Sequence, residues 1–430
     1  MSKNWRFETL AIHGGRELDP ATLASGVPVS RTSAFAFKSV KHGADLFALK
    51  EPGYIYSRLS NPTVSTLEQR ITLLEGGAAS VAVASGNSAV YYAVAALAQA
   101  GDEIVSGANL YGGTYAMFSS TFPQLGLKTH FVDARDPENF KKAITSKTKA
   151  LFIETIGNPA LDVTDVAEVA RIAHEEEIPL IVDGTFTTPY LWRTIEDGAD
   201  IVVNSLTKWM CGHGTAIGGS ITDSGKFKWK DNKKFPLFNE PDPNFHGKRW
   251  AHDLPDALAS IPYTMRLRAV PLRNLGACLS PDNAWIFLQG LETLPFRMER
   301  HVKNAAKVAE YLASHTKVDW VRFPGLKDDS SYPIASKYLK KGFGGMVVFG
   351  AKGGIEAGAR FIDALTLFSN VANVGDTKSL ALHPASTSHS QLSEEQQRAG
   401  GLSPELVRLS IGIEHIDDIL SDIENALQKA

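Results

Sequence analysis

Residues 199–214 read ADIVVNSLTKWMCGHG, and this stretch decides the predicted fold. The β-branched run from Ile201 to Val203 is typical of a buried strand, and hydroxyl residues and a lysine follow it. Open α/β sheets present their chemistry at the carboxyl ends of their strands. Lys208 is therefore a candidate nucleophile, because apolar surroundings lower the pKa of a lysine and leave a neutral amine that condenses with an aldehyde to a Schiff base.

Two hydroxyl side chains stand close to this lysine in the sequence. Ser205 and Thr207 are candidate donors to a phosphate group. A lysine beside phosphate donors favours pyridoxal phosphate as the cofactor, with Lys208 as its attachment point. Taken alone, the stretch also fits a solvated loop lysine that follows a strand.

Strand and helix patterns alternate on the amino-terminal side of this stretch. Leu67, Ile71 and Leu74 share one helical face before Gly76, and residues 163–173 are amphipathic in the same way. This alternation predicts βαβ units with right-handed crossovers and a mainly parallel sheet. The strand-like runs are residues 79–84, 103–105, 128–132, 150–153, 180–182 and 201–203, and a further helix is expected over 89–100.

Polar residues follow several of these strands. Ser85, Gly86 and Asn87 stand between a strand and a helix, where backbone N–H groups at a helix amino terminus bind anions. Tyr111 precedes two glycines and is a candidate to stack on a planar ligand. The alternatives are an ordinary helix cap for the first group and an ordinary aromatic turn for the second.

Two later strands end in groups that complete the pattern. Asn158 is a candidate hydrogen-bonding group, and Asp183 directly follows three apolar residues. A buried carboxylate needs a cation, and a protonated pyridine nitrogen is such a partner. A structural aspartate that caps the next helix is the alternative for Asp183. Together these groups fit one molecule, pyridoxal phosphate, bound where the strands end.

Composition excludes several classes of protein. The chain has 430 residues, is 43% hydrophobic and carries a formal net charge of -3, which argues against a nucleic-acid partner bound by bulk electrostatics. Two cysteines, Cys211 and Cys278, are too few for a disulfide framework and have no histidine at ligand spacing. We therefore expect no bound metal and a location in the reducing cytoplasm. No apolar run is long enough to span a membrane.

The carboxyl-terminal third follows a different pattern. Residues 223–274 contain many prolines and no period, which predicts a long excursion with short helices. From residue 281 a long helix is expected to lead into an α+β layer, with a strand at 346–349 and helices at 355–367 and 417–427.

The chain resembles the pyridoxal-phosphate enzymes of cysteine and methionine metabolism. The motifs that carry this resemblance are Tyr56-Ser57-Arg58, residues 154–159, Val182-Asp183, residues 205–208 and residues 407–414. The resemblance implies an α/β, fold-type-I transferase with a mainly parallel sheet and a smaller α+β carboxyl-terminal domain. The expected divisions are an amino-terminal arm over residues 1–61 that contacts the neighbouring subunit, a cofactor-binding domain over 62–280 with an insertion at 223–274, and a last domain over 281–430.

The same resemblance assigns roles to further residues. Arg408 is expected to clamp the substrate carboxylate, with Ser379 and Asn158 as further substrate-binding groups. Tyr56 and Arg58 are expected to reach the phosphate site of the neighbouring subunit, which implies a homo-oligomer, a tetramer built from dimers that share active sites. The chain departs from the family at Asn87, Gly184 and Arg31, none of which removes a catalytic group.

Within the family, the excursion at 223–274 is like the insertion that lengthens the homoserine-ester sulfhydrylases. Methionine γ-lyases carry a cysteine where this chain has Gly113. The implied reaction replaces the γ-acetoxy group of O-acetylhomoserine by sulfide, or by a small thiol such as methanethiol, to give homocysteine or methionine and acetate. The alternatives are a methionine or cystathionine γ-lyase or γ-synthase, and, from another class, a non-catalytic phosphate-binding α/β protein.

Overall fold

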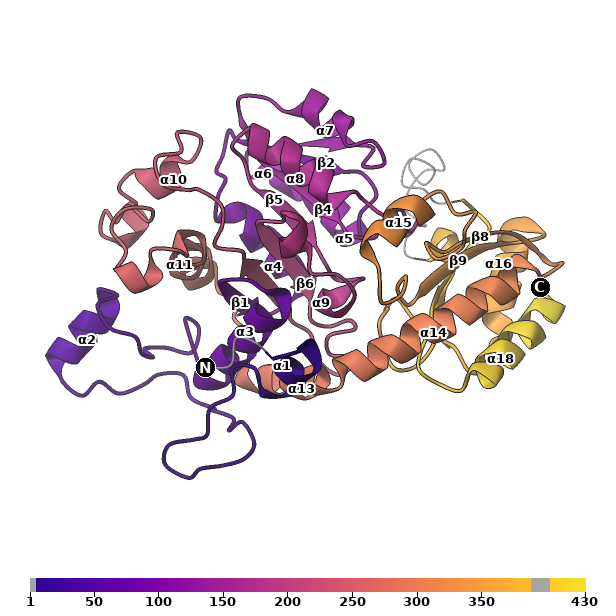
Figure 1. Cartoon of the computed structure of the whole chain (residues 1–430), viewed down its shortest axis with the longest axis horizontal. Helices are drawn as coiled ribbons and strands as arrows, with labels where there is room; N and C mark the ends of the chain where they lie inside the picture. Colours follow the sequence, from indigo (N-terminus) through magenta and orange to yellow (C-terminus); the bar gives the residue numbers. More distant parts are fainter. Residues whose placement is uncertain (1–4, 388–402) are drawn as a thin grey trace.

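The structure is a computed structural model that describes residues 5–387 and 403–430. Figure 1 shows two parts that lie side by side, each a sheet with its helices. The long helix α14 (Leu294–Ala313) runs from the first part to the second. Helix α1 (Phe7–His13) packs on the body of the molecule, whereas α2 (Val40–Phe47) extends away from it. None of the described helices is long and apolar enough to cross a membrane.

The larger sheet has seven strands in the order β1-β7-β6-β5-β4-β2-β3. Only β7 runs antiparallel to its neighbours, so the prediction of a mainly parallel sheet is confirmed. The sequence analysis assigned no strand to β7, because Ile221 is its one large apolar residue. The strands are β1 (Ala79–Val83), β2 (Glu103–Gly107), β3 (Lys128–Val132), β4 (Thr148–Glu154), β5 (Leu180–Asp183), β6 (Ile201–Ser205) and β7 (Gly219–Asp223).

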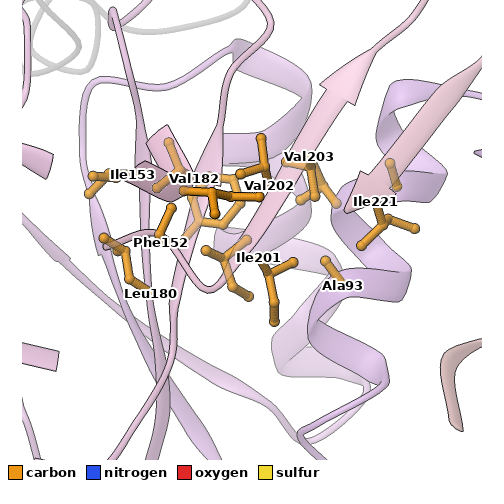
Figure 2. Packing of buried hydrophobic residues seen from close by; sticks show 14 of the residues in the cluster. Ala93, Phe152, Ile153, Leu180, Val182, Ile201, Val202, Val203 and Ile221 are labelled. Carbon is orange, nitrogen blue, oxygen red and sulfur yellow. The ribbon is translucent and has the colours of Figure 1, made fainter. Parts of the chain in front are cut away.

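Apolar side chains of the central strands form the core of this sheet. Figure 2 shows side chains of β4, β5, β6 and β7 packed together with Ala93 of α4. The labelled residues are almost completely buried, with Ile221 the most exposed at 2%. Full burial of one such aliphatic side chain contributes about 1.5–3 kcal/mol. The core therefore holds the strand ends, and the polar residues after them, at one edge.

Helices surround this sheet and differ from the predictions at two points. Helix α4 begins at Gly86 because the Ser85 hydroxyl caps it by accepting the Ser88 N–H at 3.0 Å, and it ends at Ala95 rather than at residue 100. The helices are α3 (Pro62–Glu75), α4 (Gly86–Ala95), α5 (Gly112–Ala116), α6 (Phe122–Gln124), α7 (Glu138–Ala143), α8 (Val166–Glu175), α9 (Thr188–Leu191), α10 (Pro236–Asn239), α11 (Pro262–Leu267), α12 (Arg273–Leu275) and α13 (Pro281–Glu292).

The single long helix expected from residue 281 is two helices. Helix α13 ends at Glu292 and α14 begins at Leu294. Pro295 has no N–H to donate to the carbonyl of Leu291, so one continuous helix would lose a hydrogen bond there. The break lets α13 pack on α1 and α3, while α14 reaches the second sheet.

The smaller sheet has five strands in the order β10-β11-β12-β9-β8. Its helices α14, α16 and α18 bury their apolar faces against it and against one another, in a core that includes Phe349, Phe361 and Ile423. This part confirms the expected α+β layer. Its elements are β8 (Val318–Arg322), α15 (Tyr332–Tyr338), β9 (Met346–Ala351), α16 (Gly354–Ala364), β10 (Ser369–Asn370), β11 (Leu380–Leu382), β12 (Leu406–Ser410) and α18 (Ile416–Lys429).

A buried arginine of α14 fastens the turn that follows Lys208. The guanidinium of Arg297 donates to the carbonyl oxygens of Trp209 at 2.7 Å and of Gly290 at 2.6 Å. Burial lowers the pKa of Arg297 to about 10, so the side chain stays charged at neutral pH. Trp209 is the next residue after the lysine, and its backbone is thus tied to α13 and α14.

Replacing Arg297 by methionine tests this link. Arg297→Met keeps the length of the side chain and removes donors that contribute on the order of 1.5–3 kcal/mol each when charged. We expect the midpoint of thermal unfolding of the cofactor-free protein to fall by several degrees. Arg300→Met, which changes an exposed arginine of the same helix, is the matched control and should leave the midpoint in place. Equal midpoints for the two variants would contradict the link.

Candidate active site

Most of the predicted site residues meet in one cavity of about 260 Å³. The carboxyl edge of the larger sheet forms one wall, and residues 372–374 and Arg408 of the carboxyl-terminal part form the other. The predicted residues that line the cavity are Ser85, Gly86, Asn87, Tyr111, Asn158, Asp183, Ser205, Thr207, Lys208 and Arg408. The structure thus brings together groups that come from segments far apart in the sequence.

The start of α4 forms an anion-binding corner of the cavity. Ser85 caps this helix, and a Cβ added at Gly86 would lie only 2.7 Å from the Cβ of Ser205. Glycine therefore lets the helix amino terminus approach the end of β6 closely. The hydroxyl of Thr207 lies within hydrogen-bond distance of the backbone of Gly218, and Ser205 donates its N–H to Thr185 Oγ1 at 2.8 Å. N–H groups and hydroxyls converge here, as a phosphate requires.

Lys208 lines the cavity three residues after the end of β6. Its Nζ donates to Asn373 Oδ1 at 2.5 Å. Burial, with a smaller contribution from the positive charge of Arg408, lowers the pKa of Lys208 to about 8. A substantial fraction of the amine is therefore neutral near physiological pH, as a nucleophile that condenses with an aldehyde requires.

Asp183 is a partly buried carboxyl group at the end of β5. Burial raises its pKa, and the N–H of Thr185 stabilises its charged form by donating to Oδ1 at 2.9 Å. No lysine, arginine or histidine among the described residues forms an ion pair with it within 4 Å. A carboxyl group that faces a cavity without a cation of its own suits the protonated nitrogen of a bound ring.

Tyr111 presents its ring at the mouth of the cavity, and the side chain is 48% exposed. Its backbone N–H donates to Glu154 Oε1 at 2.7 Å. A Cβ added at Gly113 would lie 2.5 Å from Cε1 of the ring, so the ring rests directly on this glycine. The ring is available to cover a planar ligand.

Arg408, on β12, closes the cavity from the carboxyl-terminal part. Its Nη1 donates to Asn158 Oδ1 at 3.2 Å, and no carboxylate among the described residues pairs with it. Burial lowers the pKa of Arg408 to about 10, which leaves it charged. A buried guanidinium without an anion is a site for a ligand carboxylate.

Three predicted residues lie outside this cavity. The hydroxyl of Ser379 donates to Glu414 Oε2 at 3.0 Å and accepts the N–H of Gly412 at 2.9 Å. Arg58 lies 5.5 Å from the centre of the Tyr56 ring, and both belong to the amino-terminal segment. The substrate-binding role of Ser379 and the role of Tyr56 and Arg58 in a neighbouring subunit stay predictions.

Other cavity residues were not predicted as part of the site. Asn373 is separated from Lys208 by more than a hundred residues, and no motif marks it. Thr185 and Glu154 lie next to the ends of predicted strands, and this position in the sequence is the feature that could have identified them as site residues. The remaining unpredicted residues of the lining are Val90, Thr114, Ile156, Phe186, Ile217, Ala372 and Val374.

The donor set fits pyridoxal phosphate. The helix amino terminus with Ser205 and Thr207 would hold the phosphate, Lys208 the aldehyde, Asp183 the ring nitrogen and Tyr111 the face of the ring. Glycine at position 86 adds no side chain of its own to the phosphate corner. The fold and the cavity therefore define an α/β enzyme with a site for a phosphate-bearing aldehyde.

Comparison with protein families identifies the group. Residues 8–428 match the family described as Cys/Met metabolism PLP-dependent enzyme. The chain therefore belongs to the pyridoxal-phosphate-dependent enzymes of cysteine and methionine metabolism. The predicted family, fold and cofactor are confirmed.

Curated relatives match over nearly the whole chain. The O-acetyl-L-homoserine sulfhydrylase of Leptospira meyeri is 51% identical over 433 residues, which cover 100% of this chain and 98% of that protein. The homocysteine synthase of Schizosaccharomyces pombe is 49% identical over 426 residues, which cover 99% of this chain and 98% of that protein.

A solved structure also matches closely. It is a crystal structure from Campylobacter jejuni, assigned as an O-acetylhomoserine (thiol)-lyase, and it contains a pyridoxyl-lysine 5′-monophosphate. Its TM-score is 0.94 at 39% identity, and the match covers 99% of this chain and 100% of that chain.

The lowered pKa of Lys208 is directly measurable. Only the neutral amine reacts with acetic anhydride, so trace acetylation of the cofactor-free protein at graded pH should follow a midpoint near pH 8 for Lys208. Mass spectrometry of the Lys208 peptide, with the peptide of the exposed Lys147 as reference, gives the midpoint. A midpoint near the ordinary lysine value of about 10.4 would contradict the effect of burial.

Proposed function

We propose that this chain replaces the γ-acetoxy group of O-acetylhomoserine by sulfide, giving homocysteine and acetate, and accepts a small thiol such as methanethiol to give methionine. The observation that carries the proposal is the meeting of Lys208, Asp183 and Arg408 in one cavity. The names of the relatives, O-acetyl-L-homoserine sulfhydrylase and homocysteine synthase, support the choice of reaction.

Arg408 orients the amino-acid substrate. Its buried, unpaired guanidinium binds the α-carboxylate, and Asn158 holds the guanidinium through Oδ1. Lys208 and Arg408 line the same cavity. A substrate whose α-carboxylate is bound by Arg408 therefore has its amino group on the side of Lys208. This arrangement places the α-carbon within reach of the lysine amine.

Lys208 moves the protons of the reaction. The γ-carbon cannot lose acetate unaided, so protons must leave the α-carbon and then the β-carbon first. Pyridoxal phosphate, when bound, supplies the electron sink for the charge left at the α-carbon. The amine of Lys208 takes the α-proton, because its lowered pKa leaves a fraction of it neutral near physiological pH, and Asp183 would hold a proton on the ring nitrogen.

Gly113 favours replacement over γ-elimination. The ring of Tyr111 lies so close to this glycine that a Cβ would overlap it. A cysteine at this position, as methionine γ-lyases carry, would require the ring to move. The cavity therefore has no thiol beside the ring at this position, which supports the sulfhydrylase over the lyase.

We further propose a cytoplasmic homo-oligomer, a tetramer built from two dimers in which the two chains share active sites. Tyr56 and Arg58 lie in the amino-terminal segment and do not line the cavity of the chain to which they belong. Tyr56 is 43% exposed and Arg58 is held by the carbonyl oxygen of Arg273. An exposed aromatic and basic pair outside its own site supports a role in the site of a partner chain. Two free cysteines, Cys211 and Cys278, support a reducing compartment.

Product analysis tests the reaction. With O-acetylhomoserine and sulfide, the purified protein should form homocysteine at least about tenfold faster than 2-oxobutyrate, and methionine alone should be a poor substrate. Mass spectrometry of the products gives both rates. Lys208→Ala, which removes the amine, is the control for cofactor-dependent turnover. Faster release of 2-oxobutyrate from methionine would favour the lyase, and a colourless protein without turnover would favour the non-catalytic binder.

Mixing two inactive variants tests the shared site. Arg58→Ala and Lys208→Ala chains should each be inactive alone. Hybrid oligomers contain some sites in which both residues are intact if the two come from different chains. Unfolding the variants together and reassembling them should then restore activity, up to roughly a quarter of the wild-type level for random dimers. Native mass spectrometry verifies the hybrids, and verified hybrids without activity would place Arg58 in its own chain's site.

A further inference from the structure

Two carboxyl groups end neighbouring strands inside the catalytic cavity. Glu154 is the last residue of β4 and pairs in register with Asp183, the last residue of β5. Both line the cavity; Glu154 is buried, at 7% exposed, and Asp183 is partly buried. The proposed reaction gives Asp183 a role and leaves Glu154 without one.

Glu154 faces no cation. The groups that act on its carboxyl are the neighbouring Asp183 carboxylate and the N–H of Tyr111, and none of the described lysines, arginines or histidines forms an ion pair with it. Burial and Asp183 raise the pKa of Glu154 well above its ordinary range. Two adjacent buried carboxyl groups favour a single negative charge. Each carboxyl accepts one backbone N–H, from Thr185 and from Tyr111, but Glu154 is the more deeply buried of the two, which favours the charge on Asp183 and the proton on Glu154.

Tyr111 depends on Glu154 for its position. It stands before the five-residue helix α5, and none of the ring–ring contacts of the described residues involves it. The N–H of Tyr111 donates to Glu154 Oε1 at 2.7 Å, and its ring lies on Gly113. The direction of the ring is therefore set by the backbone at residue 111, which Glu154 holds from the strand end.

We propose that Glu154 is a positioning residue that acts as a neutral carboxylic acid. Its oxygen holds the backbone of Tyr111 so that the ring covers the cofactor, and its lack of charge leaves the negative charge of the pair on Asp183. The inference deepens the proposed function and rests on it, since it takes Tyr111 and Asp183 as cofactor contacts.

The test compares a neutral isostere with an apolar residue. Glu154→Gln keeps an oxygen for the Tyr111 N–H without a charge, whereas Glu154→Leu removes the acceptor. We expect the leucine variant to lose at least about tenfold in kcat and in affinity for pyridoxal phosphate, since a buried N–H is left without a partner. Glutamine should restore both quantities to within about threefold of the wild type, because it supplies the missing acceptor. Fluorescence titration of the cofactor-free protein gives the affinity.

A double-mutant cycle and a control separate positioning from a general structural effect. In a Tyr111→Ala background the leucine and glutamine variants should differ by less than about threefold, because the ring that Glu154 positions is absent. Glu103→Gln makes the same chemical change at the opposite end of the parallel strands, where the carboxyl is bonded to His130 and Thr145, and should alter neither readout.

Two outcomes overturn the proposal. A glutamine variant as impaired as the leucine variant would mean that the proton of Glu154 is transferred during the reaction. A leucine variant that binds cofactor and turns over like the wild type would mean that Tyr111 needs no such support. If Glu154→Leu does not fold, Glu154→Asp, whose shorter side chain draws the oxygen away from Tyr111, replaces it with the same expected losses. Cofactor affinity is measured without the ester, so failure of the proposed reaction is distinguishable.

Discussion

The turn that carries Lys208 is held between the two sheets, and the rest of the site depends on it. Arg297 binds the carbonyl oxygen of Trp209, and Thr377 donates its N–H to the carbonyl of Gly212 at 2.8 Å. A Cβ added at Gly375 would lie 2.6 Å from the nitrogen of Trp209, so the carboxyl-terminal segment lies directly on this turn. Because these contacts come from α14 and from residues 375–377, the lysine is enclosed only when both sheets are in place.

This enclosure explains the electrostatics of the cavity. The partly buried Lys208 and the buried Arg408 lie close enough for their positive charges to act on one another, and the partly buried Asp183 lies beside the buried Glu154. The described residues provide no ion-pair partner for any of the four. Burying a charge without a partner is costly, and such arrangements concentrate at functional sites. The cavity therefore matches a ligand that brings its own charges, an anionic cofactor with a cationic ring and an amino acid with a carboxylate.

Two glycines determine how closely protein groups pack together around the cavity. Gly86 brings a helix amino terminus against the end of β6, and Gly113 lets the ring of Tyr111 lie close to the backbone. Both contacts would be lost with any side chain at these positions. The start of α4 and the ring of Tyr111 line the same cavity, where they can contact the phosphate and the ring of one bound cofactor.

Much of this protein follows from local sequence patterns. The apolar runs predict the parallel strands, and the residues after those runs predict the anion corner, Asp183 and Lys208, because a strand's carboxyl end is an edge shared by all parallel strands. The motif at residues 407–414 identifies Arg408 by resemblance. Strand β7 and the break at Thr293 were missed, since a short run with one large apolar residue and a helix-compatible proline carry weak local signals.

Only the tertiary structure decided which groups touch. Asn373 meets Lys208, and Arg297 meets Trp209, across long stretches of chain that no periodicity connects. The pKa of Lys208 likewise depends on burial by the second sheet, and the proton on Glu154 depends on the register of β4 with β5. Local sequence determines what each segment forms and which chemical groups it carries, because backbone preferences and apolar periodicity act over a few residues. Distances and protonation states arise from packing between distant segments, which only the folded chain brings together.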